Sequence, residues 1–330
     1  MLPAPSSCCA PVAVPLARPQ RAAIGRRRLC CTAVSLLLGA AGPDAAFALD
    51  AVAPGVWVHF GQIALVTPQD AGDIANLGVI VGAEAAAVID TGGSPAVGRR
   101  LLAAVRQVTD RPLRYVINTH LHPDHVFGNA AFAATGAAFV GHHRLPQALA
   151  ERGPYYLRSY RDQLGPAAIA EVRIIPPSVL VRERAMLDLG GRVLHLAAAG
   201  VAAHSSCDLT VLDAASGTLF TGDLLFSRHV PVLDGSLKGW LSLLPGLAAT
   251  RARRAVPGHG GAVLPWPAGL DDERRYLATL AADARRLIAA GVPLAQAVPQ
   301  IGASERGRWA LFDDYAPRDA TVAYSELEWE

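Results

Sequence analysis

The sequence predicts an α/β protein built from two β-rich halves, with helices between and after them. Up to Asp90, short apolar and β-branched runs alternate with polar residues, as in half-buried strands. A second group of predicted strands comprises Met186–Leu189, Val193–Ala197, Leu209–Asp213 and Thr218–Phe220. Apolar residues at helical spacing predict helices over Pro95–Val108 and Leu270–Ala290. The roughly 280 residues after the leader suit a single sandwich of two sheets.

Other segments complete the two halves. A strand is predicted over Leu113–Ile117 and a short helix near Phe127–Ala134. The segment 142–172, which holds three tyrosines and several arginines, is interpreted as a helical excursion before the second half. Aromatic residues near the end of the chain are expected to pack into the core rather than line a cleft, because aromatic side chains mainly bury area. These residues are Trp309, Phe312, Tyr315, Tyr324 and Trp329.

The first 48 residues contain the parts of an export signal in the expected order. Three arginines at 26–28 precede the apolar run Leu29–Ala41, which is too short to span a bilayer, and AFA at 46–48 follows as a cleavage site. We therefore expect a signal peptide over 1–48, a single domain over 49–330 and a periplasmic location. The arginines also fit twin-arginine export, so the route, Sec or twin-arginine, stays open. Cleavage would leave only Cys207 of five cysteines, which excludes a disulfide within the chain.

The charge balance argues against a nucleic-acid partner. The chain has 30 Lys and Arg against 28 Asp and Glu, and the leader holds five of these arginines and one aspartate. The remaining chain has 25 basic and 27 acidic residues, a net charge of about −2. Nucleic-acid binding needs clustered basic residues instead. No apolar run after Ala41 has the length of a transmembrane helix, so no membrane span is expected after cleavage.

The most informative stretch is THLHPDH at 119–125, which holds three histidines and an aspartate directly after a predicted strand. Side chains alternate faces along a strand, so His120 and His122 would leave its end on the same side and can hold one metal ion. Asp124 and His125 follow a proline, where the chain must turn, and can point at a second ion. Imidazole nitrogens and carboxylate oxygens are the usual ligands of catalytic zinc.

Three further candidate ligands stand at predicted strand ends. His204 follows one strand, Asp223 lies in a strand that is expected to stop at Gly222, and His259 ends a short apolar run among turn residues. Each residue alone is explained as well by an ordinary turn or loop. Together, and in this order after the histidine-rich stretch, they indicate a metal centre.

These segments resemble the metallo-β-lactamase superfamily, whose fold is a four-layer αββα sandwich with five ligand segments. VIDTG at 88–92, which contains Asp90, matches the first of the five. The resemblance implies one metal at His120, His122 and His204, a second at Asp124, His125 and His259, and Asp223 bridging both. It also implies that Asp90 orients the histidine loop rather than binding metal, because ligand histidines need a partner for the other ring nitrogen.

Some residues depart from the pattern of the β-lactamases, and these departures indicate which members of the superfamily the chain resembles more. Subclass B1 β-lactamases have a cysteine and subclass B3 a serine at the position of Asp223, whereas an aspartate is typical of glyoxalase II and related hydrolases. Cys207 lies three residues from His204 and does not match the thiolate-ligand position. It is expected to be a small, half-buried residue, as free cysteines usually are.

A closer resemblance, over nearly the whole mature chain, is to the quinoprotein relay system zinc metallohydrolases, type 1. It rests on APGVWVH at 53–59, DIANLG at 73–78, IDTGGS at 89–94, HVFGN at 125–129, HVPVLDG at 229–235 and ELEWE at 326–330. That family is named for its association with periplasmic alcohol dehydrogenases that use pyrroloquinoline quinone, which implies a quinoprotein dehydrogenase as a partner. After His204 the chain has SSCD instead of the expected Thr-Asp-Asn-like residues, which leaves the shape of that loop open.

The predicted function is that of a periplasmic dinuclear zinc metallohydrolase. A metal-bridging hydroxide would attack an ester, thioester, lactone or similar bond of a small molecule, with two Zn²⁺ about 3.5–4 Å apart and a water pKa of roughly 7. The leaving group would be protonated by Asp124 or by a metal-bound water. His229, six residues after Asp223, is a candidate catalytic residue that would donate to the oxyanion. Its alternative role is a surface imidazole bonded to neighbouring backbone.

Two other functions stay open on sequence grounds. One is a mononuclear persulfide dioxygenase of the same fold, with Fe²⁺ at His120, His204 and Asp223, because two histidines and a carboxylate suit non-haem iron. The complete second set of ligands argues for two metals instead. The other is a non-enzymatic, metal-bearing partner of a periplasmic dehydrogenase, although a structural zinc site has no use for an open dinuclear geometry. The sequence does not determine the substrate, the metal or the oligomeric state.

Overall fold

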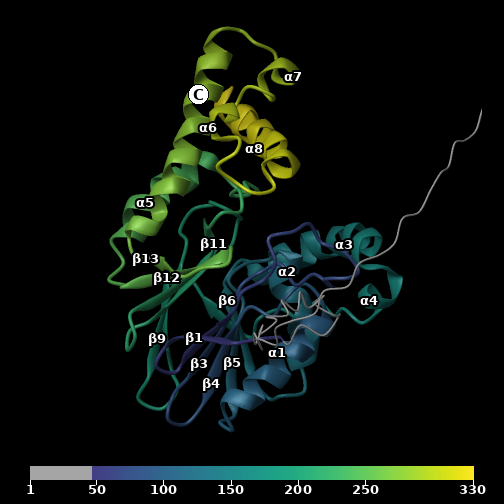
Figure 1. Ribbon diagram of the computed structural model, residues 1–330, viewed down its shortest axis with the longest axis vertical. Coiled ribbons are helices and arrows are strands. Elements are labelled where there is room, and N and C mark those ends of the chain that lie inside the picture. The colour runs from purple at the N-terminus through teal and green to yellow at the C-terminus, as the bar shows by residue number, and fades with distance from the viewer. Residues whose placement is uncertain (1–46) are drawn as a thin grey trace, which may run out of the picture. The chain divides into compact units, whose positions relative to one another are not determined.

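Two β-sheets form the centre of the computed structural model, which describes residues 47–330 (Figure 1). The first sheet has the order β1 (Asp50–Ala53), β2 (Val56–His59), β3 (Leu77–Val81), β4 (Ala86–Ile89), β5 (Leu113–Ile117), β6 (Ala138–His142) and β7 (Val179–Val181). The second has the order β13 (Leu264–Pro265), β12 (Arg254–His259), β11 (Thr218–Phe226), β10 (Leu209–Asp213), β9 (Val193–Ala198) and β8 (Arg184–Asp188). The expected signal peptide lies outside the described residues except for its last two positions.

Helices flank these sheets. The α-helices are α1 (Pro95–Val108), α2 (Pro123–Val126), α3 (Leu145–Leu164), α4 (Pro166–Ala170), α5 (Leu237–Ala248), α6 (Asp271–Ala289), α7 (Leu294–Ala297) and α8 (Phe312–Leu327). The 3-10 helices within residues 47–330 are η1 (Phe127–Phe132), η2 (Ala268–Leu270) and η3 (Ala303–Glu305). Thus α3 and α4 occupy most of the segment 142–172. Among the described residues, no helix combines the length and the apolar character needed to cross a bilayer.

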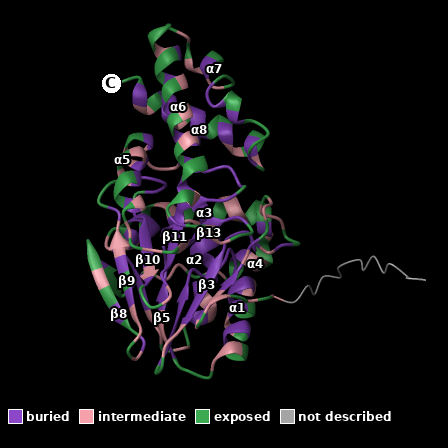
Figure 2. Cartoon of the chain, turned by 60° about the vertical axis from the view of Figure 1, so that its left-hand side comes forward, coloured by how far each residue is buried: buried purple, intermediate pink, exposed green. Residues whose placement is uncertain are grey.

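Three apolar clusters hold four layers together. Between the sheets, residues such as Ile80 and Ile117 of the first sheet pack against Val211 and Phe220 of the second. Leu101 of α1 belongs to a cluster on the outer face of the first sheet. On the outer face of the second sheet, strand residues pack against α5, α6 and α8. Figure 2 shows the strands largely buried and the outer faces of the helices exposed. The predicted αββα sandwich is therefore confirmed.

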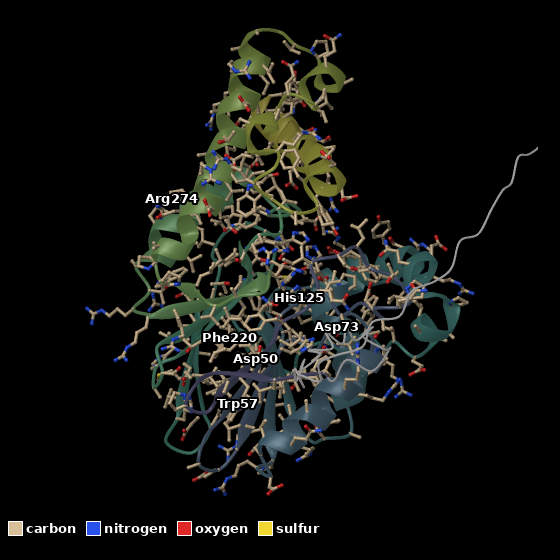
Figure 3. The ribbon with its side chains drawn as sticks, viewed as in Figure 1. Asp50, Trp57, Asp73, His125, Phe220 and Arg274 are labelled. Atoms are coloured by element: carbon tan, nitrogen blue, oxygen red, sulfur yellow. The ribbon has the colours of Figure 1, made fainter. Side chains whose placement is uncertain are left out.

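Parallel pairing brings the candidate ligand segments to strand ends that lie side by side. In the first sheet β4 and β5 are parallel, so Asp90 and the segment 119–125 leave the sheet at the same edge. In the second sheet β11 and β12 are the parallel pair, with Asp223 and His259 near their carboxyl ends. The side chains of four distant segments can therefore meet at one end of the sandwich, where Figure 3 labels His125.

The bounds of α1, β5 and β10 agree with those predicted from the sequence. The prediction that the strand before Asp223 stops at Gly222 was wrong, because β11 continues to Phe226. Gly222 marks an irregularity in the pairing with β12, and its φ is +53°. A Cβ there would lie 2.6 Å from the Cβ of Thr119. This glycine therefore lets β11 pass close to the histidine-rich segment and does not end the strand.

The aromatic residues near the end of the chain have three different environments. Trp309, Phe312 and Tyr324 are buried in the cluster on the second sheet, as expected. Tyr315 is partly buried, packs against this cluster and also lines the cleft described below. Trp329 contradicts the expectation, since it is 85% exposed. Helix periodicity explains the difference within α8, whose one face packs on the core while the other faces the cleft.

Candidate metal centre

The first group of donor atoms is formed by His120, His122, His204 and Asp223. His122 Nδ1 lies 3.0 Å from His120 Nε2 and 2.8 Å from His204 Nε2. The remaining pair, His120 Nε2 and His204 Nε2, is 3.2 Å apart. Three ring nitrogens from two distant segments therefore converge on one point. His120 and His204 are fully buried and His122 is half-buried.

The second group is formed by Asp124, His125 and His259. His259 Nε2 lies 3.1 Å from Asp124 Oδ2 and 3.4 Å from His125 Nε2. All three side chains are buried. The two groups together contain every residue that was predicted to bind metal, and the six ligands other than Asp223 divide between the groups as the resemblance implies.

Asp223 reaches both groups. Its Oδ2 lies 3.3 Å from His204 Nε2 and 3.4 Å from His259 Nε2. Its Oδ1 lies 3.2 Å from His125 Nε2 and is buried without a hydrogen-bond partner among the described residues. Gly258 makes this position available, because a Cβ there would lie 1.9 Å from Asp223 Oδ1. The carboxylate thus stands between the two groups, as a bridging ligand would.

The hydrogen bonds of the outward ring nitrogens show which nitrogen of a neutral histidine carries the lone pair that points into the donor group. His204 Nδ1 lies 2.7 Å from Val232 O and His259 Nδ1 lies 2.9 Å from Ile74 O. A carbonyl oxygen only accepts, so both Nδ1 atoms carry a hydrogen and a neutral ring has its lone pair at Nε2. Burial lowers the pKa of His204 to about 3, so this ring is neutral. Its lone pair therefore points at other ring nitrogens and at a carboxylate.

The charges of the second group also favour a bound cation. Burial lowers the pKa of His259, but the carboxylates of Asp223 and Asp124 outweigh burial and raise that pKa to about 9. Two buried carboxylates beside imidazoles create a negative potential that a divalent cation relieves. Nitrogen and carboxylate donors in these numbers suit zinc, and the residues present fit two such ions.

Asp90 lies behind the histidines, where the resemblance placed it. Its Oδ2 accepts a 2.8 Å hydrogen bond from His125 Nδ1 and a 2.7 Å bond from the Thr119 hydroxyl. Its Oδ1 accepts a 2.8 Å bond from the Thr119 backbone N–H. The φ of Asp90 is +56°, a left-handed conformation that aspartate tolerates better than most residues. The turn after β4 therefore aims this carboxylate at the histidine loop and orients His125.

Sequence reasoning missed Asp234, which makes the corresponding contact to His122. His122 Nε2 donates to Asp234 Oδ2 across 2.9 Å. Burial raises the pKa of Asp234, but bonds from His122 and Arg152 outweigh burial and hold that pKa well below its usual range. The residue belongs to the HVPVLDG segment at 229–235, in which sequence reasoning assigned a catalytic role to His229 but none to Asp234. Because 112 residues separate the partners, only the folded chain shows the contact.

A cleft of about 610 Å³ opens over the metal centre. One wall comes from a face of α3, where cleft residues recur at three- to four-residue intervals. The opposite wall includes residues of α8 and the loop after β11. The lining residues used below are Arg152, Tyr155, Tyr156, His229, Asp314, Tyr315 and Arg318.

His229 lines this cleft, but its geometry changes the role expected for it. The side chain is 2% exposed, so it is not a surface imidazole. Its Nδ1 lies 2.6 Å from Val230 O and must donate to that carbonyl. Burial lowers the pKa of His229 to about 4, so the neutral ring leaves Nε2 as an acceptor. His229 in this tautomer accepts a proton or hydrogen bond and does not donate one to an oxyanion.

Cys207 takes no part in the metal centre. It is fully buried beside Ser205, whose hydroxyl lies 3.8 Å from its Sγ, and burial raises the pKa of the thiol to about 12. The side chain is thus more buried than expected and stays protonated. It packs in the cluster beneath α3, together with Leu121 and Tyr156.

Known proteins share this fold. The family model of the metallo-β-lactamase superfamily matches residues 71–278. A metallo-β-lactamase from Pontibacter korlensis is 20% identical with a TM-score of 0.57, over 70% of this chain and 98% of that one. A stereoselective inverting sec-alkylsulfatase from Pseudomonas sp. is 16% identical with a TM-score of 0.65, over 84% of this chain and 50% of that one.

A curated relative matches a shorter region. The linear primary-alkylsulfatase of a Pseudomonas species is 36% identical over 58 residues, which are 18% of this chain. The chain spans only 11% of that relative in the match, so the likeness covers one segment of a longer protein. The family model, in contrast, covers more than half of the chain, including all the candidate ligands. With both sheets and both donor groups in place, the chain belongs to the metallo-β-lactamase superfamily.

Proposed function

We propose that this protein is a metal-dependent hydrolase that works with two zinc ions per chain. The observation that carries the proposal is the position of Asp223 between two complete donor groups. A site for a single ion would not require the second group, Asp124, His125 and His259. The cleft above both groups gives a small molecule access to them.

Two zinc ions in such a site supply Lewis acidity and lower the pKa of a water molecule to roughly 7. The residues of the chain would hold the two ions and orient the side chains that bind them. Asp90 and Asp234 fix the rings of His125 and His122 through their outward nitrogens. Asp124 lines the cleft, and the proposal leaves the protonation of the leaving group to Asp124 or to a metal-bound water. His229 offers an acceptor at the other side of the cleft.

The bond that is hydrolysed is proposed to be an ester, thioester, lactone or a similar bond. Sulfate esters belong in the same substrate panel, because two of the similar proteins are alkylsulfatases by name. The fold alone does not select among these substrates, since it serves many chemistries.

We also propose membership of the quinoprotein relay system metallohydrolases, type 1, a periplasmic location and association with a dehydrogenase that uses pyrroloquinoline quinone. The support is the set of segments quoted above, and one of these segments contains Asp234, which contacts a candidate ligand. The leader with its three arginines and AFA site supports export.

Metal analysis of the purified protein, combined with a substrate panel, tests the proposal. We expect close to two zinc ions per chain and hydrolysis of at least one ester, thioester, lactone or sulfate ester, and His122→Ala should lose metal and activity together. One tightly held iron, with oxygen uptake on a persulfide, would establish the dioxygenase alternative instead. Full zinc content without any hydrolysis across the panel would favour the non-enzymatic partner.

A further inference from the structure

Two arginines from opposite walls of the cleft meet beside the metal centre. Arg152 of α3 and Arg318 of α8 both donate to the carboxylate of Asp234. The carboxylate is buried, with its side chain 7% exposed, whereas the side chains of Arg152 and Arg318 are 36% and 52% exposed. The guanidinium groups therefore stand between a buried anion and the open cleft, which both of them line.

The cluster of Asp234, Arg152 and Arg318 has more positive than negative charge. Asp234 carries one negative charge, and its bond from His122 comes from a ring that is neutral when it serves as a ligand. Among the described residues, neither arginine has another ion-pair partner. Asp314 is an exposed cleft residue without an ion pair to either guanidinium. Each guanidinium has five N–H donors, and Asp234 uses only a few of them. One positive charge and several donors thus face the cleft.

Tyr156 adds an independent sign of a missing partner. Tyr156 is one of the residues that line the cleft, and its hydroxyl is buried without a hydrogen-bond partner among the described residues. The Arg152 guanidinium lies 5.0 Å from the centre of the Tyr156 ring. A buried hydroxyl without a partner is costly, because it has given up its bond to water. A ligand atom that accepts from this hydroxyl would remove the cost.

We propose that the substrate carries an organic oxyanion, such as a carboxylate, apart from the bond that is hydrolysed. Arg152 and Arg318 bind this oxyanion, with the Tyr156 hydroxyl as a further donor, and Tyr155 at the cleft mouth contacts the apolar part of the substrate. Asp234 joins both arginines to His122, so the oxyanion is seated next to the first donor group. The substrate class is therefore an acid-substituted ester or thioester. This inference rests on the hydrolase function proposed above.

The test compares two p-nitrophenyl esters of equal chain length, one neutral and one ending in a carboxylate. For the zinc-loaded protein, we expect kcat/KM to favour the acid-substituted ester at low salt and the preference to shrink as salt screens it. Arg318→Gln should reduce the preference about 10-fold, the scale of one charge-assisted hydrogen bond. Arg318→Lys should retain part of it. Tyr156→Phe, which keeps the ring, should reduce it several-fold. Arg158→Gln, an exposed arginine of α3 outside the cleft lining, is the matched control.

A binding measurement separates this inference from the hydrolase proposal. Calorimetry with an arylsulfonate, a poor zinc ligand, should give about 10-fold weaker binding to Arg318→Gln than to the wild type. If no ester is hydrolysed but this difference is found, the hydrolase proposal fails and the oxyanion site stands. Equal sulfonate affinity in the wild type, Arg318→Gln and Arg152→Gln would overturn the inference. Equal ester preference in these three proteins would overturn it as well, and would leave the arginines a purely structural role.

Discussion

His122 Nε2 donates a 2.9 Å hydrogen bond to Asp234 Oδ2, which links a candidate metal ligand to the loop after β11. The same carboxylate accepts hydrogen bonds from Arg152 of α3 and Arg318 of α8. Asp319, the next residue of α8, accepts a 2.8 Å bond from the backbone N–H of Leu233 and so holds this loop. The orientation of His122 therefore depends on three elements that are distant in sequence.

Replacing Asp234 should weaken metal binding without removing a ligand. In Asp234→Asn the acceptor for His122 loses its charge, so the ring is held less firmly and is a weaker donor. We expect the affinity for the first zinc ion to fall about 10–100-fold, the usual effect of losing such a partner. Competition with a chromophoric chelator measures it. Asp162→Asn, at an exposed position of α3, controls for the change in net charge. Equal affinities in both variants would contradict the role of Asp234.

Replacing Asp223 should reduce the metal content more than replacing Asp90. Asp223→Ala removes a carboxylate that reaches both donor groups, so we expect the loss of one metal or both. Asp90→Ala removes only the acceptor behind His125 and should leave partial occupancy. Metal content by mass spectrometry distinguishes the variants. Full occupancy in both would show that the two roles are assigned wrongly.

His229 should matter for turnover and little for metal content. It lines the cleft and offers Nε2 as an acceptor, but it belongs to neither donor group. For His229→Ala we expect both metals to be retained and turnover to fall about 10²-fold or more, the scale of a lost proton acceptor. His195→Ala, at an exposed position of β9, is the control. Unchanged turnover on a substrate of the wild type would leave His229 with a packing role.

The buried carboxyl of Asp319 should make stability depend on pH. Burial raises its pKa to about 7, although bonds from Leu233 and Tyr276 oppose the shift, against 3.8 as the ordinary value. Between about pH 4 and 7 the folded state holds a proton that the unfolded state has released, so this group destabilises the fold increasingly as pH rises. Asp319→Asn should therefore gain stability relative to the wild type over this range, by a few kcal/mol at about 1.4 kcal/mol per pKa unit. Urea unfolding at several pH values measures the difference. A constant difference from pH 4 to 7 would contradict the raised pKa.

The expected cleavage after Ala48 would remove contacts that Phe47 and Ala48 make with the folded domain. The ring of Phe47 stacks on that of His59, with the ring centres 3.6 Å apart, and Ala48 O lies 3.0 Å from His59 Nδ1. We expect protein from the periplasm to begin at Leu49, as measured by mass spectrometry. A chain that begins at Leu49 should unfold about 2–4 °C below one that begins at Ala46, the scale of one aromatic contact. An intact leader on periplasmic protein would contradict the export signal.

The sequence by itself determined which residues are candidate ligands and most of the elements that carry them. Strand and helix periods are local properties, so α1, β5 and β10 were predicted with their observed bounds. The spacing of His120, His122, Asp124 and His125 likewise needs no long-range information. Gly222 shows the limit of this reasoning, because a glycine that ends a strand and one that allows a close approach look the same in a sequence.

Only the tertiary structure decided which groups meet and in which protonation state. The partnership of His122 with Asp234 spans 112 residues, and nothing in the local pattern encodes it. The Nδ1 of His229 donates to a backbone carbonyl, so the neutral ring offers Nε2 as an acceptor and not as the donor that the sequence led us to expect. Arg152 and Arg318 face the same cleft because α3 and α8 belong to different layers that meet at one end of the sandwich. Hydrogen-bond direction and charge balance depend on positions in space, which periodicity does not specify.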